Sequence, residues 1–312
     1  MKMKSSDIYY YKRIRITFLF VAVITFLIGC GDAKKNTDAD KEEWISLFNG
    51  KDLKDWDIKF NKEPLGVNYK NTFQVADGMI RVVYDDYEIF DEYYAHLYYK
   101  QPFSYYKIRF DYRFTGNQTT GGATWNVRNS GVMIHSQSAA SNGFNQEFPT
   151  SIEIQLLGGL EDGKERPTAN LCTPMTAVEM NGDVTYDHCI NSSSKTYFGD
   201  QWVHVEAIVL GGESVTHIVE NDTVLVYQKP QLGSSDFDAE LDLFGVSDKA
   251  EWLQKEGEVL TEGYIALQAE SHPIDFKNIE VLDLCGCMDP KAKNYKSYYI
   301  KAANSTCIYD SK

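Results

Sequence analysis

The stretch Ser151-Ile-Glu-Ile-Gln-Leu-Leu157 alternates polar and apolar side chains, which is typical of a β-strand with one face against a core. Successive side chains of a strand point to opposite faces, so Glu153 and Gln155 are predicted to share one face. The upstream run Arg128-Asn-Ser-Gly-Val-Met-Ile-His135 predicts a second strand that begins with polar residues and ends in a histidine. If both strands lie in one concave sheet, Glu153 lies in a cleft with polar neighbours. This cleft is the predicted functional site.

Strand-like runs of this kind continue from Trp44 to Leu284, separated by short clusters of Gly, Asn and Asp. Between Tyr106 and Phe114, charged residues alternate with apolar ones, as in a strand with one face in water. Helical periodicity is scarce, and one short helix is predicted in the range 248–256. The pattern predicts an all-β fold, a jelly-roll sandwich of two antiparallel sheets.

The N-terminus predicts export from the cytoplasm. The apolar run from Ile16 to Ile28 follows basic residues, has the length of a signal-peptide core, and is short for a membrane span. It ends in Leu27-Ile-Gly-Cys30, which resembles a bacterial lipobox, so residues 1–29 are expected to be removed and Cys30 lipidated. An ordinary cleaved signal and a short membrane anchor are the alternatives.

Residues 30–43 are polar and charged, which predicts a flexible tether between the lipid and the folded domain. The chain is therefore expected to be exported and held by its lipid on a bacterial membrane. The periplasmic side and the cell surface are both open as its location.

The acidity of the chain limits its partners. The formal net charge is −14, and removal of residues 1–29, with five basic residues and one acidic residue, makes it −18. Nucleic acids and other polyanions are excluded, because phosphate binding needs clustered Lys and Arg. An acidic surface is compatible with neutral ligands such as sugars.

A series of short motifs resembles the 3-keto-disaccharide hydrolase family, long known only as a domain of unknown function. The motifs occur in order along the chain: Leu47-Phe-Asn-Gly-Lys-Asp-Leu53 with Trp56, Asn129-Ser-Gly131, Glu153-Ile-Gln155, Gly263-Tyr-Ile-Ala-Leu-Gln268 and Phe276-Lys-Asn-Ile279. The resemblance implies a concanavalin A-like jelly roll over residues 44–284. It also implies hydrolysis of glycosides that are oxidised to a ketone at sugar carbon 3.

One departure from the family pattern concerns the turn before the last strand. The usual His-Gly is replaced here by Ala269-Glu-Ser-His-Pro273. Roles that the family assigns to this turn therefore do not transfer directly to this chain.

A 3-keto group acidifies the neighbouring C–H, so the glycosidic bond can break by elimination, followed by addition of water. This route needs a general base, an acid for the leaving oxygen, and donors to the developing enolate. Glu153 is predicted to act as base or acid, with His135 or His272 as its partner. Arg128 is the predicted enolate donor.

The ordinary glycosidase route requires instead two carboxylates about 5–10 Å apart. Glu147, Glu153 and Glu270 could provide such a pair. The residues predicted to bind the substrate lie on the same strands or in adjacent loops: Trp125, Arg128, Asn129, Gln155, Gln268 and Glu270.

Each of these residues also has a structural interpretation. Glu153 could form an internal ion pair with Arg128 or Arg166, and Gln155 could pair with the backbone. His135 could be an ordinary surface histidine, and Trp125 could be a loop residue that packs locally. Arg128 and Asn129 could shape a turn, while Gln268, Glu270 and His272 lie at a strand end; a structural role is also expected for His217.

Metal signals are weak in this sequence, and no metal or other cofactor is predicted. Four alternating acidic residues could gather around calcium, namely Asp236, Asp238, Glu240 and Asp242. They lack the glycine of an EF-hand loop, so a solvated acidic insertion is the favoured interpretation. No His-x-x-x-His or Cys-x-x-Cys spacing indicates zinc.

Five of the six cysteines follow Cys30, and an exported protein permits disulfides. A Cys172–Cys189 bridge is predicted to tie the excursion at 166–197 near the site. A Cys287–Cys307 bridge would close a small C-terminal segment, residues 285–312, which leaves Cys285 unpaired.

Two further classes of function remain open alongside a glycoside hydrolase or lyase. A lectin without catalysis is one, because folds of this type host both roles. A surface assembly or adhesion protein is the other, which the lipid anchor and the many tyrosines would suit.

Overall fold

The computed structural model describes residues 41–161 and 163–310 of the 312-residue chain. The predicted signal peptide and Cys30 therefore lie outside the described residues. Within the described ranges, no helix is both long enough and apolar enough to cross a membrane.

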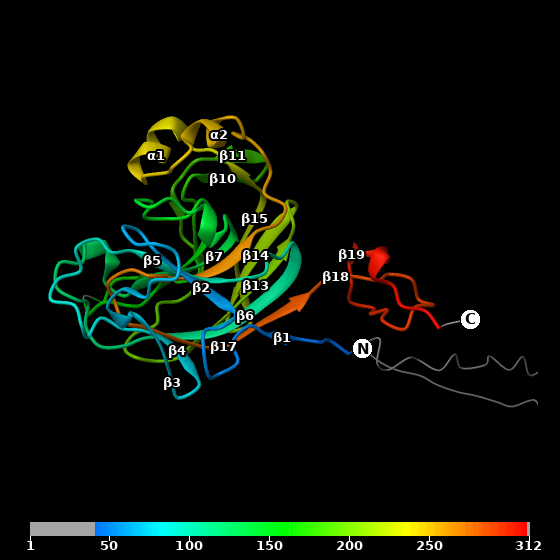
Figure 1. Ribbon diagram of the computed structural model, residues 1–312, viewed down its shortest axis with the longest axis horizontal. Helices are drawn as coiled ribbons and strands as arrows, with labels where there is room; N and C mark the ends of the chain where they lie inside the picture. Colours follow the sequence, from blue (N-terminus) through cyan, green and yellow to red (C-terminus); the bar gives the residue numbers. More distant parts are fainter. Residues whose placement is uncertain (1–40, 162, 311–312) are drawn as a thin grey trace, which may run out of the picture. The chain divides into compact units, whose positions relative to one another are not determined.

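Two large antiparallel sheets make up most of the structure (Figure 1). The ten-stranded sheet has the order β11 (Asp183–Thr185), β10 (Thr176–Met180), β15 (Asp222–Leu232), β14 (Ser214–Val219), β13 (Val203–Leu210), β6 (Tyr105–Phe114), β17 (Ile274–Asp283), β4 (Met79–Val82), β3 (Phe73–Ala76), with β1 (Ile45–Ser46) also paired to β17. The seven-stranded sheet has the order β12 (Cys189–Ile190), β9 (Asn170–Cys172), β8 (Ile152–Leu157), β7 (Asn129–Ser136), β16 (Tyr264–Ala269), β5 (Ala95–Tyr99), β2 (Trp56–Phe60). The predicted all-β jelly-roll sandwich is confirmed.

The core lies between the two sheets and follows the predicted alternation. In β8, Ile152, Ile154 and Leu156 are fully buried and belong to the same hydrophobic cluster as Ile108 and Phe110 of β6. Burial of each such side chain contributes roughly 1.5–3 kcal/mol to folding. Because side chains alternate along a strand, Glu153 and Gln155 lie on the face of the smaller sheet that points away from this core.

Two short α-helices precede β16: α1 (Phe237–Leu243) and α2 (Lys249–Leu253). The helix predicted in the range 248–256 is α2, and α1 was not foreseen. Asp236 begins α1 as its N-cap, since its side chain accepts a hydrogen bond from the Ala239 N–H at 3.2 Å. The 3₁₀ helices are η1 (Tyr69–Asn71), η2 (Thr124–Asn126), η3 (Ala139–Ser141) and η4 (Asn304–Thr306).

The acidic run around α1 makes contacts within the protein. Asp238 and Asp242 lie 3.0 and 2.6 Å from Lys249 Nζ. Glu240 accepts a hydrogen bond from the Met175 N–H at 3.0 Å. No group of three or more His, Cys, Asp or Glu suited to a metal occurs within residues 41–161 and 163–310. The structure thus gives the calcium alternative no ligand cluster in these ranges.

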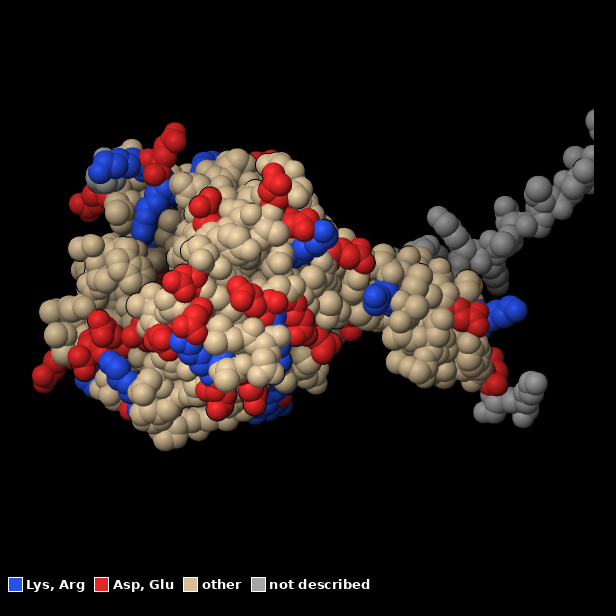
Figure 2. All heavy atoms as spheres, turned by 90° about the horizontal axis from the view of Figure 1, so that it is seen from above, with Lys and Arg blue, Asp and Glu red and all other residues tan. Residues whose placement is uncertain are grey.

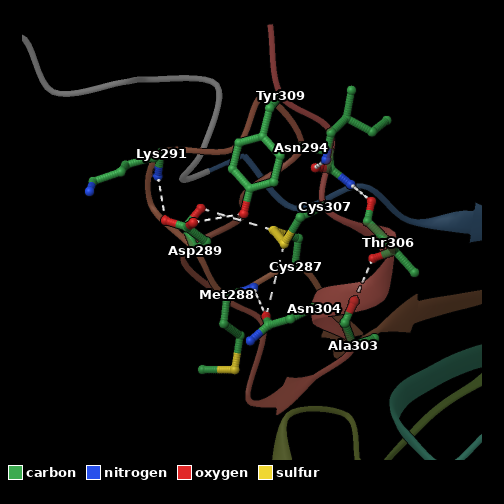
Figure 3. Close-up of a disulfide and its surroundings, with 11 residues drawn as sticks. Cys287, Met288, Asp289, Lys291, Asn294, Ala303, Asn304, Thr306, Cys307 and Tyr309 are labelled. Carbon is green, nitrogen blue, oxygen red and sulfur yellow. Dashed lines mark hydrogen bonds between the residues drawn. A yellow bond between two sulfur atoms is a disulfide. The ribbon is translucent and has the colours of Figure 1, made fainter. Parts of the chain in front are cut away.

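Both predicted disulfides are present, Cys172–Cys189 and Cys287–Cys307. The second closes the C-terminal segment, which contains the parallel strands β18 (Cys285–Gly286) and β19 (Lys301–Ala302). Around this bridge, Asp289 accepts hydrogen bonds from the Lys291 N–H and the Tyr309 hydroxyl (Figure 3). Cys285 is a free thiol, as the odd number of cysteines predicts.

The surface has the acidic character expected from the net charge of −14. Red acidic side chains are widespread on the face shown in Figure 2, with fewer blue basic ones between them. This face offers no large basic patch of the kind that binds a polyanion.

Candidate active site

Glu153 reaches sideways across the neighbouring strand. Strand β8 pairs with β7 so that Glu153 lies opposite Met133 and Gln155 lies opposite Gly131. A Cβ at position 131 would lie 2.7 Å from Glu153 Cγ, closer than real contacts allow. The glycine of the Asn129-Ser-Gly131 motif therefore makes room for the Glu153 side chain to extend toward β16.

The side chain of Glu153 lines a pocket of about 670 Å³ on the outer face of the smaller sheet. Asn129 from β7, Gln155 from β8 and Glu270, just beyond the end of β16, line it too. The other lining residues come from loops, from η2 and α1, and from β8, β9 and β12: Tyr94, Thr124, Trp125, Glu147, Phe148, Leu157, Leu160, Arg166, Cys172, Pro174, His188, Cys189, Leu243 and Phe244.

The two buried carboxyl groups of the pocket resist ionisation. Burial raises the pKa of Glu153 to about 8. Burial, and then the negative charge of Glu153, raise the pKa of Glu270 well above its usual value, against the opposing charge of Arg166. Two buried carboxyl groups with raised pKa in one pocket are typical of acid–base sites.

Polar atoms of the pocket lining lack hydrogen-bond partners. Among the described residues, Asn129 Oδ1 and Glu270 Oε2 are buried without a partner. Gln268 Oε1, on β16, is also buried without a partner, but Gln268 does not line the pocket. A buried polar atom without a partner is unfavourable, so such atoms mark a place where a ligand would supply the missing bonds. Gln155 is already paired, because its Oε1 accepts a hydrogen bond from Asn170 Nδ2 at 3.1 Å. Its partner is a side chain, not the backbone.

Aromatic rings form one wall of the pocket. Trp125 is 54% exposed and lies parallel to Tyr94, with 6.4 Å between ring centroids. Phe148 packs against Tyr94 at 4.9 Å and against Phe244 at 5.4 Å. Trp125 therefore packs locally and also offers an open face to the pocket.

His135 is not brought to the pocket. Its backbone has a positive φ of 49°, and its Nε2 lies 3.0 Å from the Gly211 carbonyl oxygen, on the turn between β13 and β14. Burial lowers the pKa of His135 to about 4. The prediction that His135 partners Glu153 is wrong, and so is the alternative of a surface histidine, because the ring is buried.

Arg128 also has a structural position. Its guanidinium donates to the Gly199 carbonyl oxygen, lies 3.4 Å from Asp200 Oδ1, and lies over the Phe114 ring. It does not line the pocket, so the predicted role of enolate donor is not supported. Arg166 lines the pocket instead, and its Nη1 donates to the carbonyl oxygens of Arg128 and Gly158.

His272 is buried in the turn between β16 and β17. Its ring packs edge-on against Phe114 at 5.6 Å and does not line the pocket. Burial, and then the positive charge of Arg128, lower the pKa of His272 to about 4, so the ring is neutral at neutral pH. The second predicted partner of Glu153 is therefore replaced by Glu270, which lines the pocket two residues earlier in the chain.

Two further titratable residues were named from the sequence, His217 and Glu147. His217 is buried, with Nδ1 2.9 Å from the Ala169 carbonyl oxygen and Nε2 2.9 Å from the Tyr227 hydroxyl, so its role is structural. Glu147 lines the pocket, and burial raises its pKa.

One family model matches most of the chain. Residues 43–282 match the model described as the 3-keto-alpha-glucoside-1,2-lyase-like domain. The chain belongs to this family. Comparison with curated protein sequences gives no match.

Several solved structures are similar to this lyase-like domain. Two are candidate glycosyl hydrolases from Parabacteroides distasonis, at 18% and 20% identity, TM-scores of 0.45 and 0.43, and coverage of 77% of this chain with 99% and 93% of theirs. A Bacillus subtilis protein with a galectin-like fold has 12% identity and a TM-score of 0.42, over 78% of this chain and 97% of its own.

The lyase-like domain brings two of its sequence motifs together at the pocket. Asn129-Ser-Gly131 and Glu153-Ile-Gln155 lie side by side, with Gly131 opposite Gln155. Glu270 belongs to the turn in which this chain departs from the usual His-Gly. The departure thus supplies a second carboxyl group to the pocket.

Proposed function

We propose that the chain cleaves 3-keto glycosides by elimination, with Glu153 as general base and Glu270 as general acid. The observation that carries the proposal is the pair of buried carboxyl groups with raised pKa in one pocket. The charge of an ionised Glu153 opposes ionisation of Glu270, so one carboxyl group is charged at a time, and Glu153 is the one that we assign as base. Glu270 keeps its proton and suits the acid.

In the first step, the ionised Glu153 takes the proton from sugar carbon 2, which the ketone at carbon 3 has acidified. The electron pair of the C–H bond forms an enolate, and the Asn129 amide and Arg166, which line the pocket, are the proposed donors to its oxygen. Collapse of the enolate breaks the bond between carbon 1 and the leaving oxygen. That oxygen receives the proton of Glu270.

The step leaves Glu153 protonated and Glu270 ionised, so transfer of one proton from Glu153 to Glu270, directly or through solvent, restores the pair. Addition of water across the new double bond then yields the free 3-keto sugar. The overall reaction is hydrolysis of the glycosidic bond, and the residues carry out acid–base chemistry alone.

The proposed setting is outside the cytoplasm, on a bacterial membrane, through a lipid on Cys30. The support for this part is the sequence of the N-terminus, with its apolar run and its lipobox-like ending. A carbohydrate ligand suits both this setting and the acidic surface.

A carbohydrate-binding protein without catalysis is the second candidate. The exposed face of Trp125 favours it, because an aromatic ring beside polar groups is a common platform for a sugar ring. The raised pKa values of Glu153 and Glu270 have no part in simple binding, and this is why catalysis is preferred.

The test uses the purified protein with a 3-keto disaccharide and with the parent disaccharide. Cleavage of the keto form alone is expected, and Glu153→Gln should lower its kcat by about 10²–10⁴-fold. Glu251→Gln, at an exposed position on α2, is the matched control and should keep wild-type activity. Binding by the wild type without any product would favour the lectin; cleavage by Glu153→Gln at the wild-type rate would overturn the role of Glu153.

A further inference from the structure

The pocket has an apolar end, formed by Phe148, the Cys172–Cys189 disulfide, Pro174, Leu243 and Phe244. These groups gather near the start of β8. The Glu147 N–H donates to the Phe244 carbonyl oxygen at 3.2 Å, and the Ser151 N–H donates to that of Pro174 at 3.4 Å. Cys172 lies opposite Glu153 in the pairing of β8 with β9. The apolar end therefore begins on the strand beside Glu153.

Leu243 extends this surface to the rim of the pocket. As the last residue of α1, it is 73% exposed, the highest value among the large exposed hydrophobic side chains of the described residues. A single exposed leucine is ordinary, but here it continues a surface that also contains Phe244, Phe148 and a disulfide. A ligand lying on this surface would remove apolar area from water.

Few hydrogen-bonding side chains line the apolar end of the pocket. His188 stacks on Phe244, with 6.4 Å between ring centroids, and its Nδ1 lies 3.9 Å from Glu240 Oε1. Glu147 is the other polar side chain there, and its pKa is raised by burial. A second sugar carries several hydroxyl groups, and each one left without a partner would weaken binding.

We propose that the leaving group of the substrate is an apolar alcohol, cycloaliphatic or aromatic, that packs against the apolar end. The inference rests on the proposed function, since it places the sugar ring at Glu153, Asn129 and Gln155. The substrate class is then a 3-keto glycoside with an apolar aglycone, in preference to a 3-keto disaccharide. Leu243 and Phe244 set this preference.

The experiment compares three 3-keto glucosides whose leaving groups are methanol, cyclohexanol and glucose, all of them alcohols. For the full wild-type chain, kcat/KM for the cyclohexyl glycoside should exceed that for the glucosyl glycoside by about tenfold or more. Leu243→Ser should reduce the cyclohexyl-to-methyl ratio of kcat/KM by about tenfold, chiefly through KM. Leu65→Ser is the control, because Leu65 is exposed and lies outside the pocket lining.

Equal or higher kcat/KM for the glucosyl substrate, or an unchanged ratio in Leu243→Ser, would overturn the inference while leaving the proposed function intact. If none of the three glycosides is cleaved, the proposed function fails. The inference is then tested by measuring the binding affinity of the same three compounds. Tighter binding of the cyclohexyl glycoside that Leu243→Ser weakens and Leu65→Ser does not would support the apolar end. Equal binding of all three would contradict it.

Discussion

The pKa of Glu153 depends on where its carboxyl group lies. The residue lies on the outer face of the sheet, yet it is buried because the pocket walls surround it. Loss of water raises its pKa to about 8, so the carboxyl group can exchange a proton near neutral pH. Glu270 is also buried, and the charge of an ionised Glu153 raises its pKa further, so Glu270 keeps its proton and suits the acid while Glu153 suits the base.

Gly131 decides how Glu153 is placed, and Gly131→Ala tests this. The new Cβ would collide with the Glu153 side chain and displace its carboxyl group. Cleavage of a 3-keto glycoside should fall by about 10²-fold, because displacement of a catalytic group by about 1 Å has this effect. Activity and the thermal midpoint should be measured together.

The control for this variant is Gly212→Ala, on the turn between β13 and β14. Its Cβ would also collide with a side chain, that of Val259. The strands on either side of Gly212 belong to the larger sheet, whereas the pocket lies on the smaller one. Wild-type activity is expected there. Full activity in Gly131→Ala would show that the close approach of Gly131 to Glu153 has no functional role.

At single positions, the sequence predicted the face of Glu153 correctly, but not its partner. Period-two alternation gives the face of a strand without any knowledge of the fold. The partner depends on which strands are neighbours, and β7 and β16 are far apart in the chain. His135 was a reasonable candidate by alternation, and its positive φ, which turns the ring toward Gly211, has no signal in the sequence.

The elements around the sheet matter because they turn a flat face into a pocket. Strands β9 and β12, joined by Cys172–Cys189, form the edge beside β8. Helix α1 ends at the rim with Leu243, followed by Phe244. Helix α1 has a sequence signal that was missed, since Asp236 is an N-cap and Phe237, Leu241 and Phe244 have the i, i+4, i+7 spacing of an apolar helix face. Its part in the pocket could not be predicted, because that depends on long-range packing.

The disulfide of this edge gives a prediction at the scale of the element. The double variant Cys172→Ser/Cys189→Ser should lose about 3 kcal/mol of stability in the chain-entropy model, since the bridge spans 17 residues. A thermal midpoint lower by roughly 5–10 °C is expected, measured by calorimetry.

The bridge of the C-terminal segment serves as comparison. Cys287→Ser/Cys307→Ser removes a bridge of similar span, 20 residues, that does not line the pocket. Activity should therefore fall further in the first double variant than in the second. Equal activity in both would mean that the edge formed by β9 and β12 does not shape the site.

For the whole molecule, sequence patterning was sufficient for the sandwich but not for the pocket. Alternation in many runs, together with the ordered family motifs, leads to two sheets around one core. The residues that sequence reasoning missed, among them Arg166, Tyr94, Phe148 and Phe244, come from loops or from residues next to short elements. Their meeting at one pocket follows from long-range packing, which no local pattern encodes. The lipid anchor at Cys30 and the absence of a metal stay predictions.

The most direct test of the central claim is the pH dependence of kcat/KM for a 3-keto glycoside. Glu153 must be ionised to act as base, so activity should be low below its pKa and rise with pH through a midpoint near 8. Burial alone raises the pKa of Glu153, and Glu270 keeps its proton on this limb, so Glu270→Gln should lower kcat/KM but leave the midpoint of the rising limb near 8. A rate that does not change with pH around this value, or a rising limb that persists unchanged in Glu153→Gln, would contradict the account.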